Sequence, residues 1–103
     1  MLDLLHSDHF TAVADRLLHL RLPDGRQLAL AIDSVTQAPR SAMPESRRVP
    51  FCVTLHSLEP TDFVDGLCTL DLPDHGEVSD LYVSRNPPLG RDASLGYFSI
   101  VFN

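Results

Sequence analysis

Histidines are the first candidates for chemistry in this chain, because two of the five lie at a spacing that can hold a metal ion. His6 and His9 are three residues apart at the start of an expected helix, and such a pair can provide two ligands. The sequence fixes no third ligand, whereas structural zinc sites show four at recognisable spacing. We therefore expect a solvated helix end and no metal. The sequence leaves open whether His6, His9 and His75 converge.

Cys52 and His56 form the next candidate, because a thiol beside an imidazole is a common nucleophile–base pair. On a strand, residues four apart share a face but lie ~13 Å apart along it, so we expect no contact between them. Ser57 and Ser84 lack the glycine-flanked turn that exposes a catalytic serine. The chain has no lysine, which excludes Schiff-base and P-loop chemistry.

Aspartates are the third group, and five of them lie between residues 62 and 80. Paired carboxylates perform acid–base catalysis when their environments separate their pKa values. Charged residues are mostly exposed, so we expect a solvated acidic face, and the pattern does not match a calcium loop. The residues concerned are Asp62, Asp65, Asp71, Asp74 and Asp80. We predict no catalytic, cofactor-binding or metal-binding residue, and no cofactor.

A partner-contact surface is the functional feature that the sequence favours. Arg47 and Arg48 form an adjacent basic pair in an expected loop, and Arg91 lies in a second loop. Tyr82 and Tyr97 lie in expected strands and would point outward. Exposed aromatic side chains anchor partners, but they also pair across strands on a barrel wall, and we favour this second role. These five residues are still the predicted contact surface.

The periodicity of apolar residues predicts the elements that position these side chains. Residues 6–15 are expected to form one short helix, with Ser7 as its cap and Phe10 and Val13 facing the core. From residue 18 onward the period changes to two, which is typical of strands. The expected strands are residues 18–22, 28–32 with a continuation to Val35, 51–56, 68–72, 78–85 and 95–103.

Turn residues separate these strands. Pro23-Asp24-Gly25-Arg26 and residues 73–77 are predicted tight turns. Residues 38–50 contain three prolines and no periodicity, so they are the expected long loop, and residues 86–94 are the second loop. Residues 57–65 are an expected connection. The phase of the apolar pattern breaks within 78–85, and a bulge near Ser79-Asp80 would explain the break.

A similar order of elements occurs twice. Residues 20–25 resemble residues 70–76, and each segment precedes a strand, a loop with proline and arginine, and an aromatic strand. Turn chemistry alone can produce such similarity. The other interpretation is two three-stranded units related by a pseudo-twofold. We predict an all-β fold, a barrel-like sheet of six mostly antiparallel strands with one short N-terminal helix, which would hide its sheet edges.

Length and charge limit the class of protein. A chain of 103 residues is expected to be a single domain, residues 1–103. With 14 acidic and 8 basic residues the net charge is −6, so nucleic acid is a poor partner. There is no apolar run of membrane-spanning length and no secretory signal pattern, so we expect a cytoplasmic protein with reduced thiols and no membrane partner. The protein partner and the oligomeric state, including a homo-oligomer, stay open.

Several short motifs resemble a family of small bacterial proteins known only as a domain of unknown function. They are the Leu-rich start leading to His9-Phe10, the entry Arg48-Val49-Pro50-Phe51, and the ending Tyr97-Phe-Ser-Ile-Val-Phe-Asn103. The resemblance covers nearly the whole chain and implies no catalytic residues. Members of that family occur near genes for phage-tail-like collar proteins. The resemblance therefore implies an accessory or assembly role. The alternative from the fold alone is a small-molecule binder or enzyme that uses the barrel mouth.

Overall fold

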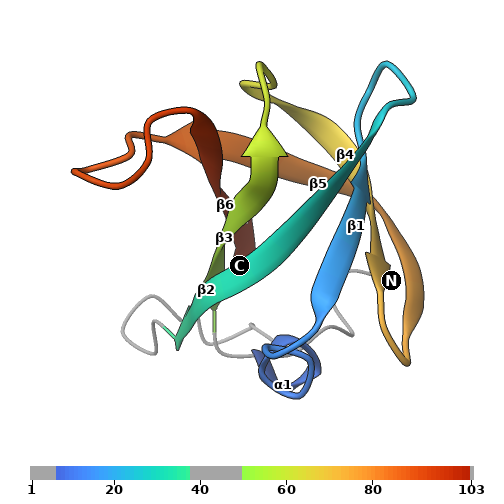
Figure 1. Ribbon diagram of the computed structural model, residues 1–103. Helices are drawn as coiled ribbons and strands as arrows, with labels where there is room; N and C mark the ends of the chain where they lie inside the picture. Colours follow the sequence, from blue (N-terminus) through green and yellow to red (C-terminus); the bar gives the residue numbers. More distant parts are fainter. Residues whose placement is uncertain (1–6, 38–49, 103) are drawn as a thin grey trace.

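The computed structural model describes residues 7–37 and 50–102. These residues form one short helix and six strands, as the sequence predicted (Figure 1). The elements are α1 (Ser7–Thr11), β1 (Leu17–Arg21), β2 (Gln27–Gln37), β3 (Phe51–Pro60), β4 (Asp65–Leu72), β5 (Gly76–Asn86) and β6 (Leu95–Phe102). Within these ranges, no helix is long and apolar enough to cross a membrane.

The six strands close into a barrel in the order β1-β2-β3-β6-β5-β4, and every pair of neighbouring strands is antiparallel. This ring maps onto itself when the first three strands are exchanged with the last three. Leu20 pairs with Leu70 where β1 meets β4, and these are the matching leucines of the two similar segments. The connectivity therefore has the twofold form of two three-stranded units.

Alternate side chains of the strands point inward and fill the barrel. In β1, Leu18 and Leu20 are fully buried, and in β6 the buried row is Phe98, Ile100 and Phe102, as the period of two predicted. Burying side chains of this size contributes roughly 1.5–3 kcal/mol each relative to exposure. Apolar burial is therefore the main force that closes the barrel.

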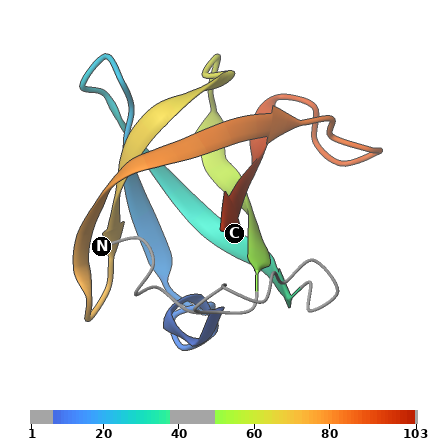
Figure 2. The ribbon, with the colours of Figure 1, turned by 180° about the vertical axis from the view of Figure 1, so that it is seen from behind.

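Aromatic residues close both ends of the barrel. At one end, Phe10 of α1 packs against Phe51 and Phe102, with ring centroids 5.8 and 5.3 Å away. At the other end, Phe63, in the connection between β3 and β4, lies 5.7 Å from Phe98. The helix thus covers one mouth, as Figures 1 and 2 show, and Phe63 covers the other.

Two bulges change which residues face the core. Cys68 pairs with Leu81 and Leu70 pairs with Val78, so Ser79 and Asp80 oppose one residue of β4. This confirms the predicted bulge and explains why Val78, Leu81 and Val83 are all buried. A second bulge, in β2, was not predicted. Ile32 pairs with Leu55 and Ser34 with Thr54, which leaves Asp33 as the extra residue.

Several boundaries differ from the sequence-based expectation. The helix ends at Thr11, because the following residues make shorter bonds, such as Val13 N to Phe10 O, and form turns. Strand β3 continues to Pro60 through the expected connection, since Leu95 of β6 pairs with it there. Most of the predicted long loop, residues 38–49, lies outside the described residues.

Candidate functional site

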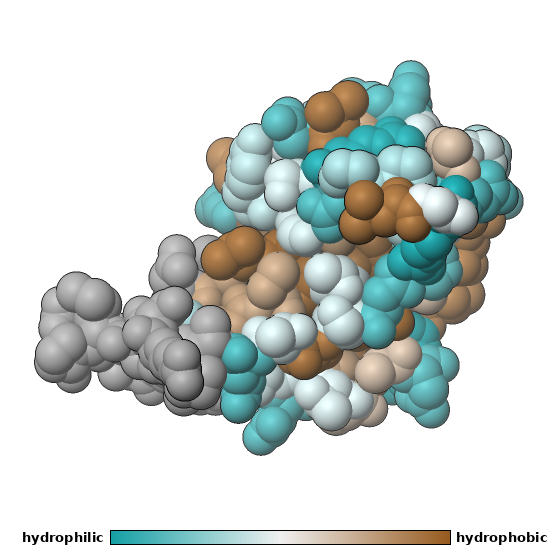
Figure 3. Space-filling model, turned by 90° about the vertical axis from the view of Figure 1, so that its left-hand side faces the viewer, coloured by the Kyte–Doolittle hydropathy of each residue, from teal (hydrophilic) through white to brown (hydrophobic). Residues whose placement is uncertain are grey.

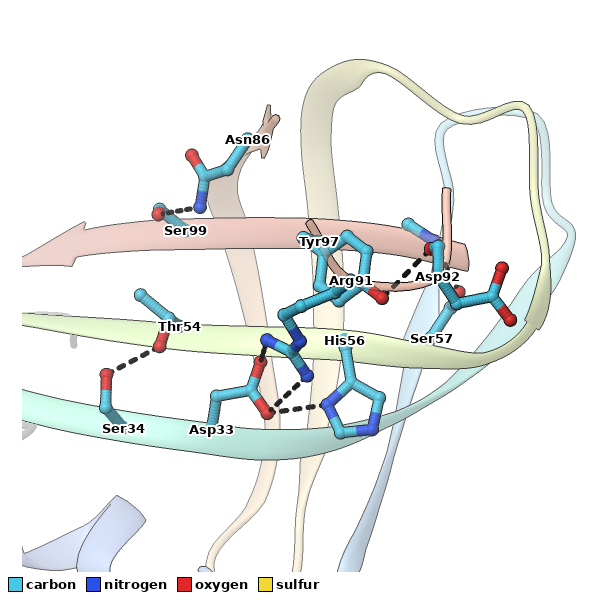
Figure 4. Close-up of polar contacts among 11 residues, drawn as sticks. Asp33, Ser34, Thr54, His56, Ser57, Asn86, Arg91, Asp92, Tyr97 and Ser99 are labelled. Atoms are coloured by element: carbon cyan, nitrogen blue, oxygen red, sulfur yellow. Dashed lines mark hydrogen bonds and ion pairs between the residues drawn. The ribbon is translucent and has the colours of Figure 1, made fainter. Parts of the chain in front are cut away.

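The most developed polar cluster on the outer wall of the barrel forms around Asp33, the extra residue of the β2 bulge. Asp33 follows Ile32, which packs against the core, so the alternation of the strand places its carboxylate on the outer wall of β2 and β3. His56 Nδ1 lies 2.6 Å from Asp33 Oδ1. Arg91 donates from its two terminal nitrogens, at 2.9 Å to Oδ2 and 3.4 Å to Oδ1 (Figure 4). One carboxylate thus ties β2 to β3 and to the loop before β6.

Partial burial would raise the pKa of Asp33, but hydrogen bonds from Arg91 and His56 outweigh it and hold this pKa below its usual value. The side chains of Asp33 and His56 are only 23% and 25% exposed. A charged carboxylate that is mostly buried needs hydrogen-bond partners, and the Arg91 guanidinium and the His56 ring are these partners. The Asp33 carboxylate is therefore charged near neutral pH, and its hydrogen bonds are satisfied.

Tyr97 forms the floor beneath Arg91. The guanidinium lies 4.3 Å from the centre of the Tyr97 ring, and the Tyr97 hydroxyl donates to the carbonyl of Asp92 at 3.0 Å. Tyr97 is the register partner of His56 on the outer face, as expected, but it is only 6% exposed. The ring thus has the favoured role of a cross-strand partner on the wall and is not an exposed anchor, because the loop folds back over the wall and covers it.

Residues 87–94 form a loop that projects to the left of the barrel in Figure 1. Figure 3 views the molecule from that side, where hydrophobic residues form patches between polar ones. Asp92 accepts bonds from the backbone N–H and the hydroxyl of Ser94, at 2.9 and 2.7 Å. These bonds and the Arg91 contacts fix the base of the loop. At its tip, Leu89 is 85% exposed, with a positive φ of 52°.

A cleft of about 190 Å³ lies beneath this loop. Pro87, Pro88 and Leu89 line one side, and Thr54 and Tyr97 line the other. Next to it, Ser34 and Thr54 share a hydrogen bond of 2.6 Å, and Asn86 donates to Ser99 at 2.6 Å. The wall beneath the loop therefore carries satisfied polar groups.

The Asp33–His56 pair resembles the orienting half of a catalytic triad, yet the rest of a triad does not adjoin it. Ser57 is fully buried, donates to the carbonyl of Glu59 and accepts from Gly96 N–H. Cys52 is paired in register with Val101 and Thr36, away from His56, so the predicted separation is confirmed. In the described chain the pair holds a loop in place.

The other predicted candidates lie elsewhere. Tyr82 is 55% exposed on β5 and donates to Asp65 at 3.0 Å. His9 and His75 meet edge to face, with ring centroids 5.0 Å apart. His6, Arg47 and Arg48 lie outside the described residues. Within residues 7–37 and 50–102, no group of three metal-ligating side chains occurs.

Sequence reasoning identified Arg91 and Tyr97 but missed Asp33 and His56 as their partners. A signal existed in the apolar pattern. Ile32 and Val35 both pack against the core, and their separation of three breaks the period of two. The same kind of break led to the correct bulge at Ser79-Asp80. Applied to residues 32–35, it would have pointed to Asp33.

Comparison with the curated proteins and comparison with the solved structures found no match. A family model does match, over residues 5–102, which includes every strand and the loop described above. The description of that family is "Domain of unknown function (DUF6916)". Since the match covers nearly the whole chain, this protein belongs to that family.

Proposed function

We propose that this domain is a non-enzymatic interaction or assembly protein whose contact surface is loop 87–94 with the wall beneath it. The observation that carries the proposal is Leu89, an 85% exposed leucine at the tip of a loop that is fixed at its base. Burial of such a side chain by a partner is favourable. A loop that is already ordered loses less conformational entropy on binding.

Arg91 gives this surface specificity. Its guanidinium is half exposed although it contacts Asp33 and Tyr97, so the outer edge can still donate to a partner. Arginine is enriched among the residues that dominate binding energy at protein interfaces. The predicted contacts Arg47 and Arg48 remain part of the proposal on sequence grounds alone.

The filled interior favours this surface over the barrel mouth. Inward side chains such as Leu30, Leu55 and Leu70 are fully buried, and Phe10 and Phe63 cover the two ends. A ligand inside the barrel would have to displace this packing, which is costly because protein interiors are close-packed. The mouth-based binder or enzyme therefore loses its structural support.

We infer a cytoplasmic setting and an assembly role in phage-tail-like particles, as the resemblance of the sequence implies. The free thiols of Cys52 and Cys68 support a reducing compartment. Co-purification of the chain with such particles, or its absence from them, tests this setting separately from the contact surface.

Photo-crosslinking tests the contact surface. A photoreactive residue is placed at Leu89 and, as a matched control, at Leu17, which is 50% exposed on β1. We expect one dominant protein adduct from position 89 and none from position 17. The captured protein is then purified, and its affinity is measured for the unmodified chain, Leu89→Asp and Leu17→Asp.

Leu89→Asp should weaken binding by about tenfold or more, and Leu17→Asp should leave it unchanged. Both variants should unfold within about 0.5 kcal/mol of the unmodified chain, because both leucines are exposed. Equal effects of the two substitutions, or identical adducts from both positions, would reject the loop as the contact surface.

A further inference from the structure

The outer wall of β4 and β5 is a second surface with its own chemistry. In the ring of strands, the β4–β5 seam lies opposite the β2–β3 seam that carries Asp33 and His56. In Figure 2, which shows the molecule from behind, the turn of the β4–β5 hairpin lies at the lower left and loop 87–94 projects at the right. The further inference concerns this wall and is independent of the contact surface proposed above.

An exposed apolar pair lies at the centre of this wall. Leu67 and Tyr82 are register partners across β4 and β5, and they are 58% and 55% exposed. The Tyr82 hydroxyl donates to Asp65 at 3.0 Å. This bond restricts the ring against the wall, so less side-chain entropy is lost when a partner covers it.

Carboxylates lie along the same wall, with Asp65 and Asp80 near the apolar pair and Asp71 and Glu77 farther along the two strands. Asp71 faces Glu77 directly across the two strands, and like charges in this position destabilise a sheet. Arg21 lies 3.3 Å from Glu77, but no arginine of the described chain forms an ion pair with Asp71 or Asp80. The wall therefore has a surplus of negative charge beside its apolar centre.

We propose that the β4–β5 wall docks a protein segment that carries arginine or lysine next to apolar side chains. Leu67 and Tyr82 would cover the apolar part, and a cation can also stack on the Tyr82 ring. Asp71, Glu77 and Asp80 would pair with the basic side chains. A second copy of this chain is a poor occupant, because each copy carries a net charge of −6 and like charges repel.

Titration of the full, isotope-labelled chain followed by NMR tests this proposal. The probe is a short peptide of alternating arginine and leucine, and its matched control has glutamate in place of arginine. Spermine serves as a second control, because it carries positive charge without apolar side chains. We expect the basic peptide to shift amide signals of β4 and β5, and we expect the shifts to weaken as salt increases.

Variants then separate this surface from loop 87–94. Leu67→Ser and Tyr82→Ala should each weaken binding of the basic peptide by about tenfold. Leu89→Ser should leave the affinity for the basic peptide unchanged. The same substitution should weaken binding of the partner that contacts loop 87–94. Three results would overturn the proposal: equal binding of the glutamate peptide, spermine binding as tight as the peptide, or signal shifts that lie on loop 87–94 rather than on β4 and β5.

Discussion

At the scale of single residues, the side chains that could do chemistry have a structural role. Asp33, His56 and Arg91 form one hydrogen-bonded cluster that ties two strands to a loop. Sequence alone could identify Arg91 as a loop residue and His56 as a strand residue. It could not bring them together, because their meeting depends on the pairing of β2 with β3 and on the fold of residues 87–94.

Replacing Asp33 by asparagine should remove one pH-dependent contribution to stability. The pKa of Asp33 in the folded chain lies below its ordinary value of 3.8, so its contribution is present above that pH and is lost as the pH falls through the lower, folded value. The difference in Tm between the chain and Asp33→Asn should therefore shrink as the pH falls below 3.8. Ser34→Ala, a non-titrating neighbour, is the control. A difference that stays constant with pH would contradict the charged cluster.

The two cysteines should differ in reactivity. Cys68 is buried, and burial raises the pKa of its thiol to about 11, so the reactive thiolate is scarce at neutral pH. Cys52 is partly exposed on the outer wall. Mass spectrometry after brief alkylation of the folded chain should find Cys52 modified and Cys68 intact. In denaturant both should react, and fast modification of Cys68 in the folded chain would argue against its place in the core.

At the scale of elements, the period of two predicted the strands, and breaks in that period mark the bulges. Strand β3 was expected to end near His56 but continues to Pro60, because its end is stabilised by pairing with Leu95 of β6. Such long-range pairing leaves no signal in a local pattern. The start of β6 at Leu95 was predicted, but the close packing of Gly96 against Phe98 and Thr61 was not, because it too depends on residues brought together by the fold.

Gly96→Ala should destabilise the barrel. A Cβ at this position would lie 2.6 Å from the Phe98 ring and 2.8 Å from Thr61 Cγ2, so one of these must move. Overpacking of this kind costs about 1–3 kcal/mol. Denaturant unfolding measures this change in the free energy of unfolding. The control is Ser84→Ala, on a less crowded part of β5, and equal stability of the two variants would show that the packing around Gly96 is loose.

At the scale of the whole molecule, the barrel closes through β6, which pairs with both β3 and β5. The fold class, the strand count and the likeness of the two halves followed from the sequence, because period-two patterns and turn residues are local. The order of strands did not, since it depends on which strands meet after the chain folds. The sequence also did not predict that Phe10 and Phe63 cover the two ends of the barrel, although Phe10 was expected to face the core.

Removal of residues 97–103 should abolish cooperative unfolding. It deletes the buried row of Phe98, Ile100 and Phe102 and leaves β3 and β5 without their neighbour. Thermal unfolding followed by circular dichroism measures the result. A truncated chain that still melts cooperatively at an unchanged temperature would contradict the closed barrel.

The most direct test of the central claim, that this filled barrel acts through its outer surface, is amide hydrogen exchange of the chain with and without the protein captured at position 89. The account predicts slower exchange in residues 87–94 and in the adjoining parts of β3 and β6, with no change around Phe63 at the covered mouth. Protection that centres on Phe63 and the β1–β2 turn, with residues 87–94 unchanged, would contradict it.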